Sequence, residues 1–467
     1  MNTWLKDASS LADSVRRREV RAADVVEASL AAIEKSKLNA LTYLDADGAR
    51  RQAEAIDERV KRGEDPGPFA GVPMLVKDVE DAAGWATTHG SLVFKDNIAE
   101  SDSTHVARLR EAGAVFVGKS ATSEFGFVAY TSTKLHGVTR NPWNLERTPA
   151  GSSGGSAAAV AGGLVPAATG GDGGGSIRLP ASYTGLVGMK GTFGRIPRGP
   201  KAPIGQLAAV KGTVARSVRD AARWYDVTAG YDARDPFSLP RQDGWEAGLG
   251  AHGVKGMRVA VAPDLGNAVV HPEVVKIVSE AADVLVEAAG LRRLDIDVKV
   301  PENGLAWARA GLPSLIADLK DYWPECKQEL TFEIHFAMEA SPAYRAWHGA
   351  AVETFRVEMN EAMADLFEQV DIVLCATSPM EPFAAEGPMP YNVGEVAVSP
   401  YNAGALTIPA NLSGYPAISI PAGLSSSGLP IGLQAYARRH EDALLLDLAQ
   451  VMERARPWPL VAPGSPI

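Results

Sequence analysis

Two kinds of hydrophobic pattern alternate along the chain, and each predicts a different element. Apolar residues recur at helical spacing between charges over residues 10–35, and the segments 47–62 and 103–113 also read as helices. Short apolar runs that follow glycine or proline, at 71–78 and 114–119, predict buried strands. The first third of the chain is therefore expected to alternate helices with strands.

The same two patterns continue to the C-terminus. Further strands are expected at 257–263, 372–377 and 417–423, and helices at 272–289, 303–320, 342–369 and 441–454. Strands that alternate with helices favour an α/β fold, a sheet with helices on both faces. Because no repeat or low-complexity linker splits the chain, we expect one large α/β unit over residues 1–467, with residues 300–400 as a candidate helical insertion or cap over a site.

Composition and charge narrow the classes of function. The chain has 467 residues, a net charge of −10 and a pI near 5.4. No block rich in lysine or arginine occurs, so neither a nucleic acid nor an anionic membrane is an expected partner. The chain has no apolar signal segment and no membrane-spanning run, which favours a cytoplasmic protein. Cys326 and Cys375 are expected to be free buried thiols. The sequence does not determine the oligomeric state, and a homodimer is compatible with it.

Residues 113–120, GAVFVGKS, match the phosphate-loop pattern GxxxxGK[ST]. That pattern binds phosphate when a flexible loop follows a strand and presents its N–H groups. Here a predicted helix precedes the match, and the residues from Ala114 to Val117 have the character of the strand itself. Nucleotide binding is therefore not expected.

Two glycine–serine loops carry the chain's candidate chemistry, at 151–156 and 171–176. In the second loop, Gly173, Gly174 and Gly175 directly precede Ser176, which is expected to open a helix. A nucleophile in acyl transfer needs backbone N–H donors for the developing oxyanion, and glycines let the backbone approach the substrate. This pattern points to Ser176 as a nucleophile.

A serine nucleophile also needs a base, and no histidine lies in a nucleophile-elbow context. A lysine is the alternative base. Lys77 ends the predicted buried strand, where desolvation would lower its pKa and leave a neutral amine. The competing interpretation is a strand-edge lysine that pairs with Asp78, and the residues alone leave both open.

Four stretches together resemble the amidase signature family. They are GVPMLVKD (71–78) with the lysine, GSSGGSAAAVA (151–161) with a first serine at Ser152, GDGGGSIRLPAS (171–182) with Ser176, and the closing motifs IPANLSGYPAISIPAG and GLPIGLQ (408–423 and 428–434). The resemblance spans nearly the whole chain. It implies one α/β/α unit with a mixed central sheet covered by helices on both faces, with N-terminal helices to about residue 65 and a catalytic core over about 66–230.

The resemblance also implies the roles of residues. Lys77 is the base, Ser152, on a cis peptide, is the proton relay, and Ser176 is the nucleophile. The N–H groups of Gly173, Gly174, Gly175 and Ser176 would form the oxyanion hole. Asp172, Arg178 and Ser153 would brace these loops. No cofactor and no metal are implied.

Three departures from the family pattern bear on the substrate. Gly171 and Gly173 stand where the family has threonines, which changes the side chains beside the oxyanion hole. Gly404 stands where the glutamine-hydrolysing tRNA-dependent subunits carry an acid. We therefore expect a stand-alone amidase with a small-molecule amide substrate. The alternatives are the same triad acting on carbamates, esters or hydrazides, and the amidotransferase subunit.

Candidates for the substrate pocket rest on position alone. Phe127, Val128, Ala129 and Tyr130 precede the first serine loop and are the predicted substrate-binding residues. Trp307, Tyr322, Trp323 and Trp347 lie in the variable region and are further candidates, although aromatic residues are more often part of the core.

Overall fold

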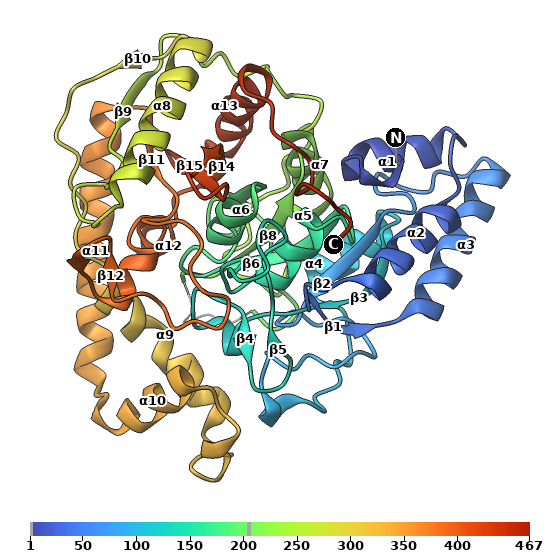
Figure 1. Ribbon diagram of the computed structural model, residues 1–467, viewed down its shortest axis with the longest axis horizontal. Helices are drawn as coiled ribbons and strands as arrows, with labels where there is room; N and C mark the ends of the chain where they lie inside the picture. Colours follow the sequence, from blue (N-terminus) through green and yellow to red (C-terminus); the bar gives the residue numbers. More distant parts are fainter. Residues whose placement is uncertain (1–2, 203–206) are drawn as a thin grey trace.

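A mixed sheet of 11 strands forms the centre of the computed structural model, which describes residues 3–202 and 207–467 (Figure 1). In order across the sheet, its strands are β1 (Leu41–Leu44), β3 (Val115–Ser120), β2 (Pro73–Lys77), β6 (Ala167–Asp172), β8 (Val210–Ala215), β7 (Val187–Lys190), β14 (Ala417–Leu424), β15 (Pro430–Ala437), β11 (Ile372–Ala376), β9 (Arg258–Val261) and β10 (Arg292–Arg293).

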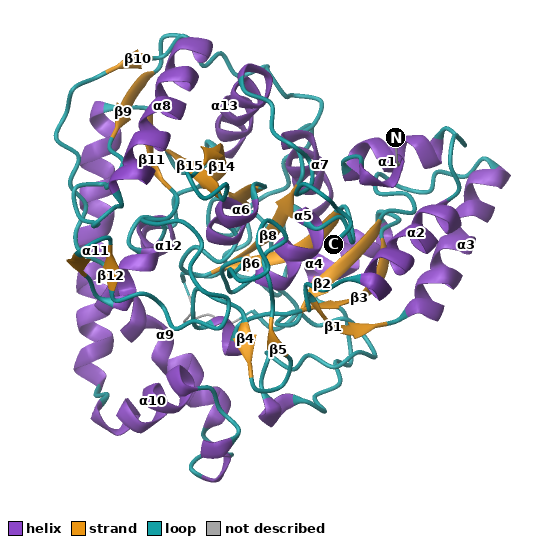
Figure 2. Ribbon diagram, viewed as in Figure 1, coloured by secondary structure: helices purple, strands orange, loops and turns teal. Residues whose placement is uncertain are grey.

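Parallel pairing is confined to two parts of this sheet. Strands β3, β2 and β6 run parallel to one another, as do β11, β9 and β10. The strands between these groups and the edge strand β1 pair antiparallel. A mixed sheet flanked by helices confirms the predicted α/β fold (Figure 2).

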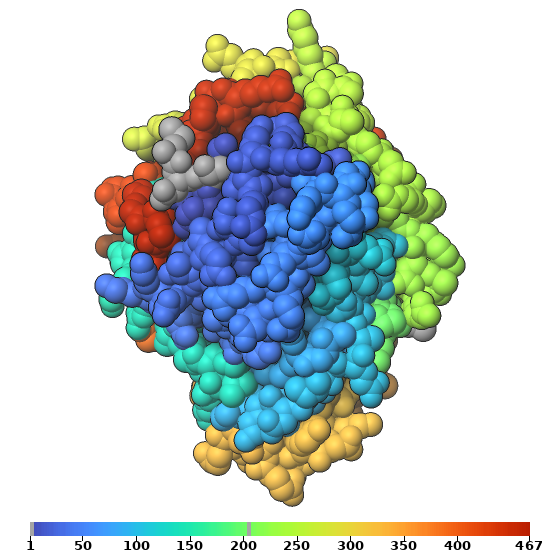
Figure 3. Space-filling view, turned by 90° about the vertical axis from the view of Figure 1, so that its right-hand side faces the viewer, coloured from blue at the N-terminus to red at the C-terminus, as the bar shows by residue number. Residues whose placement is uncertain are grey.

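The α-helices of the described residues surround the sheet. They are α1 (Ala8–Arg16), α2 (Ala22–Lys35), α3 (Ala46–Arg62), α4 (Thr104–Glu111), α5 (Gly154–Ala161), α6 (Arg178–Thr184), α7 (Val218–Thr228), α8 (Pro272–Ala289), α9 (Gly304–Leu319), α10 (Phe332–Ala340), α11 (Ala346–Gln369), α12 (Ile408–Ser413) and α13 (Asp442–Ala455). The N-terminal helices cover one side of the molecule in Figure 3.

The single helix predicted over residues 10–35 is wrong, because the chain forms α1 and α2 there. Helix α1 ends at Arg16, and Arg18 then adopts a left-handed backbone with φ of 61°. A new helix starts where Asp57 of α3 accepts the N–H groups of Ala22 and Ala23. Apolar residues recur at helical spacing on both sides of the break, because both helices pack against the same core. The spacing therefore did not reveal the break.

Two short buried helices place the glycine–serine loops. Every residue of α5 and of α6 is buried, and the two helices pack against each other and against the central strands. Alanine and glycine allow this approach, since a Cβ at Gly155 would lie 2.3 Å from the backbone nitrogen of Ala121. One loop therefore opens α5, and the other joins the end of β6 to α6.

Residues 304–369 form a helical layer that extends from the sheet, with α9, α10 and α11 at the lower left of Figure 1. Among the described residues, no helix combines the length and apolarity needed to cross a membrane. Cys326 and Cys375 are both free and buried, as predicted. Residues 115–120 of the phosphate-loop match form the fully buried strand β3.

Candidate active site

Lys77, the last residue of β2, lies against the first glycine–serine loop. The lysine is 2% exposed, and its Nζ lies 2.7 Å from Oγ of Ser152. Its backbone N–H donates to Oγ1 of Thr169 on β6, at 2.8 Å. The competing pairing with Asp78 does not form, because Asp78 lies 3.6 Å from the Nζ of Lys119 and accepts from Thr88.

Burial changes the protonation of Lys77. Desolvation is the largest influence on the amine and, together with repulsion from Lys211, lowers the pKa of Lys77 to about 7. The negative charges of Glu80 and Asp172 act in the opposite direction and are weaker. An amine with this pKa is half neutral at neutral pH, so Lys77 can accept a proton there.

The backbone around Ser152 has an uncommon conformation. The Gly151–Ser152 peptide bond is cis, and Ala150 has a positive φ of 65°. A Cβ at position 151 would lie 2.7 Å from the backbone nitrogen of Tyr130, so only glycine fits this close approach. Thr131 holds the turn by donating its hydroxyl to the carbonyl of Ala150. This backbone directs the Ser152 hydroxyl at Lys77.

The second loop is fixed by Asp172 at the end of β6. Its carboxylate accepts the N–H of Gly175 at 2.8 Å and the N–H of Ile177 at 3.3 Å. Gly175 has a φ of 127°, and a Cβ there would lie 2.3 Å from the hydroxyl oxygen of Thr407. Thr407 in turn donates to the carbonyl of Gly174, at 2.6 Å. Hydrogen bonds from the loop to Asp172 and from Thr407 to the loop therefore hold its backbone in place.

A buried ion pair holds this loop to the sheet. Arg178, the first residue of α6, donates to both carboxylate oxygens of Asp172 at 2.9 Å, and neither residue is exposed. Burial raises the pKa of Asp172, but the Arg178 charge outweighs this effect and the net pKa is well below its usual value. Arg178 also donates to Gln434 and Asn411, which satisfies its remaining donors.

Ser153 joins the two loops. Its N–H donates to the carbonyl of Ser176 at 3.2 Å, and its hydroxyl lies 3.4 Å from the backbone of Gly171. Ser153, Asp172 and Arg178 thus all contact the loop that they were predicted to brace. Ser176 itself is partly exposed, whereas Ser152 is buried.

The predicted oxyanion loop does not offer all of its N–H groups. The N–H of Gly175 donates to Asp172, so it is already engaged. No described residue accepts from the N–H of Gly173, Gly174 or Ser176. These three N–H groups therefore have no hydrogen-bond partner among the described residues. In the described residues the Ser152 hydroxyl bonds Lys77, and no bond joins it to Ser176.

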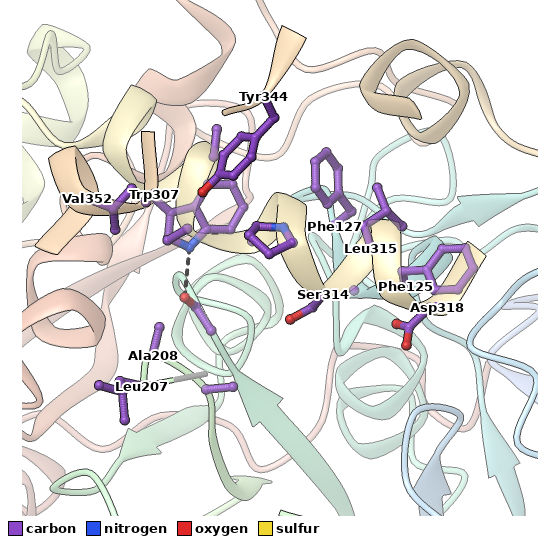
Figure 4. A pocket seen from close by; sticks show the side chains of 18 of the residues that line it. Phe125, Phe127, Leu207, Ala208, Trp307, Ser314, Leu315, Asp318, Tyr344 and Val352 are labelled. Carbon is purple, nitrogen blue, oxygen red and sulfur yellow. Dashed lines mark hydrogen bonds between the residues drawn. The ribbon is translucent and has the colours of Figure 1, made fainter. Parts of the chain in front are cut away.

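A cavity of about 440 Å³ opens beside these loops (Figure 4). Gly126 and Gly173 line it at the loop end, and a Cβ at Gly126 would lie 3.3 Å from the Ser152 hydroxyl oxygen. Trp307 of α9 lines the cavity and donates its indole N–H to the carbonyl of Gly173, at 2.8 Å. The cavity therefore borders the second loop at Gly173, and residues of α9 and α11 form one of its walls.

The structure separates the predicted substrate-binding residues into two groups. Phe127 lines the cavity, as does Trp307. Val128, Ala129 and Tyr130 instead pack in a separate apolar cluster, and Tyr130 donates its hydroxyl to Glu333. The other aromatic candidates do not line it: Tyr322 and Trp323 lie outside the cavity, and Trp347 is 61% exposed.

The glycines that depart from the family pattern all lie at this site. Gly173 lines the cavity, and the atom nearest to a Cβ built there is 3.8 Å away, so a side chain would project into open space. Gly171 is similarly open, with its nearest contact at 3.6 Å. A Cβ at Gly404 would lie 3.5 Å from the carbonyl oxygen of Gly174, so position 404 borders the oxyanion loop.

Several residues of the site were missed by sequence reasoning. Thr407 and Asn411 lie in the stretch near 408–423 that carried the family resemblance, but neither was singled out. The available signal was a polar residue inside an apolar segment, since buried polar groups need partners. Asn411 donates to the carbonyl and the carboxylate of Asp172, and Gln434 accepts from Arg178.

Comparisons with known proteins agree with this geometry. A family model for amidases matches residues 24–446. An acylamidase from Rhodococcus erythropolis is 33% identical over 468 residues, which cover 97% of this chain and 96% of that protein. The A subunit of a glutamyl-tRNA(Gln) amidotransferase from Bdellovibrio bacteriovorus is 33% identical over 491 residues, with coverage of 97% and 98%. The crystal structure of a bacterial aryl acylamidase matches with a TM-score of 0.92 and 30% identity, over 98% of both chains.

Proposed function

This chain belongs to the amidase family, and on that premise we propose that it hydrolyses carboxylic amides through an acyl-enzyme on Ser176. One observation carries the proposal. A buried lysine with a pKa of about 7 lies 2.7 Å from the hydroxyl of Ser152, at the loop that contacts Ser176. A neutral amine in that position is a base for a serine hydroxyl.

The proton follows a chain of three groups in this proposal. Neutral Lys77 accepts the proton of Ser152, and Ser152 accepts the proton of Ser176 as the Ser176 oxygen bonds to the amide carbon. The carbonyl π electrons move to the oxygen, which the N–H groups of Gly173, Gly174 and Ser176 stabilise. The carbonyl then re-forms as the carbon–nitrogen bond breaks, and Ser152 donates a proton to the leaving nitrogen while the Lys77 ammonium returns its proton to Ser152. Water releases the acyl group by the same route.

The geometry of the free protein supports the first half of this relay. The Nζ of Lys77 donates to the Oγ of Ser152 at 2.7 Å, so the two atoms are within the distance that proton transfer between them requires. The contact between the Ser152 and Ser176 hydroxyls has to form as the substrate enters, because catalytic hydrogen bonds in free enzymes are often long and tighten in the complex.

The cavity favours an acyl or aryl group with an apolar surface. Phe125, Phe127 and Trp307 supply aromatic walls, and Leu207 and Val352 supply aliphatic ones. We therefore propose aryl or alkyl amides as the substrate class, in line with the name of the structural neighbour, an aryl acylamidase. The predicted cap, residues 300–400, would act through α9 and α11, which form the outer wall.

The same triad acting on carbamates, esters or hydrazides is the alternative, because these substrates present the same carbonyl to Ser176. A role as the glutamine-hydrolysing subunit of a tRNA-dependent amidotransferase is a less favoured alternative. Position 404 borders the carbonyl of Gly174, and an acid there would face the site, but this chain has glycine. A site without that acid lacks the charge that would pair with the ammonium group of glutamine.

The test compares the wild type with Ser176→Ala. Purified protein is incubated with a fluorophosphonate probe and with a panel of anilides, primary amides and glutamine. We expect labelling at Ser176, hydrolysis of anilides and no hydrolysis of glutamine, with all activity lost in Ser176→Ala. Absence of both labelling and turnover in the wild type would refute the proposal, and hydrolysis of glutamine alone would favour the amidotransferase subunit.

A further inference from the structure

A second group of charges lies behind Lys77, outside the proposed triad. Glu80 follows β2 by three residues, is 2% exposed, and brings its Oε1 within 3.0 Å of His105 Nδ1 and 3.2 Å of Lys211 Nζ. His105 comes from α4 and Lys211 from β8. Three separate elements therefore converge on one buried carboxylate.

Both members of the Glu80–Lys211 ion pair are tied to the backbone that surrounds Lys77. The N–H of Glu80 donates to the carbonyl of Lys77 at 2.9 Å, so the chain turns back on itself there. Lys211 is the cross-strand partner of Gly171, and the carbonyl of Gly171 lies 3.5 Å from the Lys77 Nζ. Glu80 is thus linked to Lys77 directly through the backbone, and Lys211 is linked to it through Gly171.

His105 does not supply a positive charge to Glu80. Its Nε2 accepts the indole N–H of Trp224 at 2.9 Å, so the ring proton is on Nδ1 and faces Glu80. This arrangement is that of a neutral imidazole which donates one hydrogen bond. The full charge opposite Glu80 is therefore that of Lys211.

The remaining charges near Lys77 have partners of their own. Asp172 pairs with Arg178. Lys119 lies 3.6 Å from Asp78 and also donates to the Glu80 carbonyl, and His136 lies 3.6 Å from the same Asp78. His89 is partly exposed, and desolvation lowers its pKa, which disfavours a positive charge on its ring.

We propose that Lys211 is a positioning residue that keeps Lys77 neutral, with Glu80 as its counter-ion. Lys211 neutralises a carboxylate that would otherwise attract a proton to Lys77, and its own positive charge opposes protonation of the neighbouring amine. The inference rests on the proposed function, since it concerns the base of that reaction.

The electrostatics agree with this arrangement. After desolvation, repulsion from Lys211 is the largest influence that lowers the pKa of Lys77, and attraction to Glu80 is the largest that raises it. Burial raises the pKa of Glu80, but the charge of Lys211 and the hydrogen bond from His105 outweigh this effect, so the carboxyl is ionised. The ion pair therefore places two opposed charges beside the base.

The test measures the pH dependence of the rate at which a fluorophosphonate labels Ser176, so the natural substrate need not be known. Lys211→Met is expected to move the midpoint up by about one pH unit, with about tenfold slower labelling below pH 7 and a normal rate at high pH. Glu80→Gln is expected to move it down. The double variant should return close to the wild-type midpoint, because both charges are gone.

Two controls separate charge from structure. Lys211→Arg keeps the positive charge and should restore the midpoint that Lys211→Met shifts. Lys61→Met removes a lysine whose side chain is 75% exposed on α3, and it should leave the midpoint unchanged. Circular dichroism and thermal unfolding establish that each variant is folded.

An unmoved midpoint in both Lys211→Met and Glu80→Gln would overturn the inference, as would an equal loss of rate at every pH. If Lys211→Met does not fold, Glu80→Gln decides alone, because its midpoint must still fall. A wild type that is not labelled at Ser176 contradicts the proposed function itself. A wild type that is labelled, with variants that keep its midpoint, contradicts only the role of Lys211.

Discussion

Lys77→Met should abolish turnover while leaving the protein folded. Methionine matches the aliphatic part of the lysine side chain but has no amine, so Ser152 loses its base. With a pKa of about 7 in place of 10.5, half of the wild-type lysines are neutral at pH 7, against about one in 3,000 for an unperturbed amine. The wild-type kcat/KM should therefore rise with pH to a plateau, with a midpoint near 7.

The same burial makes a prediction about stability. The fall in pKa from 10.5 to about 7 corresponds to about 5 kcal/mol in favour of the unfolded chain when the lysine is protonated. The unfolded chain binds more protons than the folded protein between pH 7 and 10.5, so the contribution of Lys77 to stability falls as pH drops through that window. Lys77→Met removes this cost, and its melting temperature at pH 7 should equal or exceed that of the wild type.

Two assays check this reasoning. The first follows release of a coloured amine from an anilide between pH 5 and 10, and the second compares melting temperatures of the wild type and Lys77→Met at pH 7 and pH 9. The advantage of the variant should shrink at the higher pH. Wild-type turnover by Lys77→Met, or a midpoint of kcat/KM near 10, would refute the assignment of the base.

Three further variants test the loop and the cavity. Asp172→Asn leaves the Arg178 charge buried without its partner and should cost about 3–5 kcal/mol in urea unfolding; a loss below 1 kcal/mol would contradict this. Gly175→Ala should abolish labelling of Ser176, because a Cβ there meets Thr407 at 2.3 Å and φ is 127°. Gly173→Thr fills part of the cavity, so kcat/KM for bulky anilides should fall at least tenfold more than for acetanilide, and equal losses would argue against that position of the substrate.

The sequence predicted the strands that read as short apolar runs and missed strands that polar residues or glycine interrupt. Strands β2, β3 and β11 read as short apolar runs and were expected. Strand β15 is buried over all eight residues but contains Gly432 and Gln434, so its pattern is neither alternating nor purely apolar. Tertiary contacts explain the buried polar side chain there, because Gln434 accepts from Arg178 and donates to the carbonyl of Leu406.

Some residues of the candidate site could be recognised from local sequence, and others only from contacts between distant parts of the chain. A run of glycines before Ser176 is a local pattern with a chemical reason, so it could be recognised without a structure. The protonation of Lys77 depends on what surrounds it, and the residues alone could not distinguish a base from a partner of Asp78. Glu80 and Lys211 are far apart in the chain, and neither carries a local pattern that predicts their pairing.

The two contacts of the Trp307 indole matter for protein engineering. It belongs to the cavity wall, yet it also donates to the carbonyl of Gly173 and lies where a Cβ at Gly174 would be 2.6 Å from its nitrogen. A library that randomises α9 to admit new substrates would therefore disturb the loop before Ser176 at the same time. Trp307 should stay fixed in the first rounds of selection, while neighbours such as Leu315 and Val352 are varied.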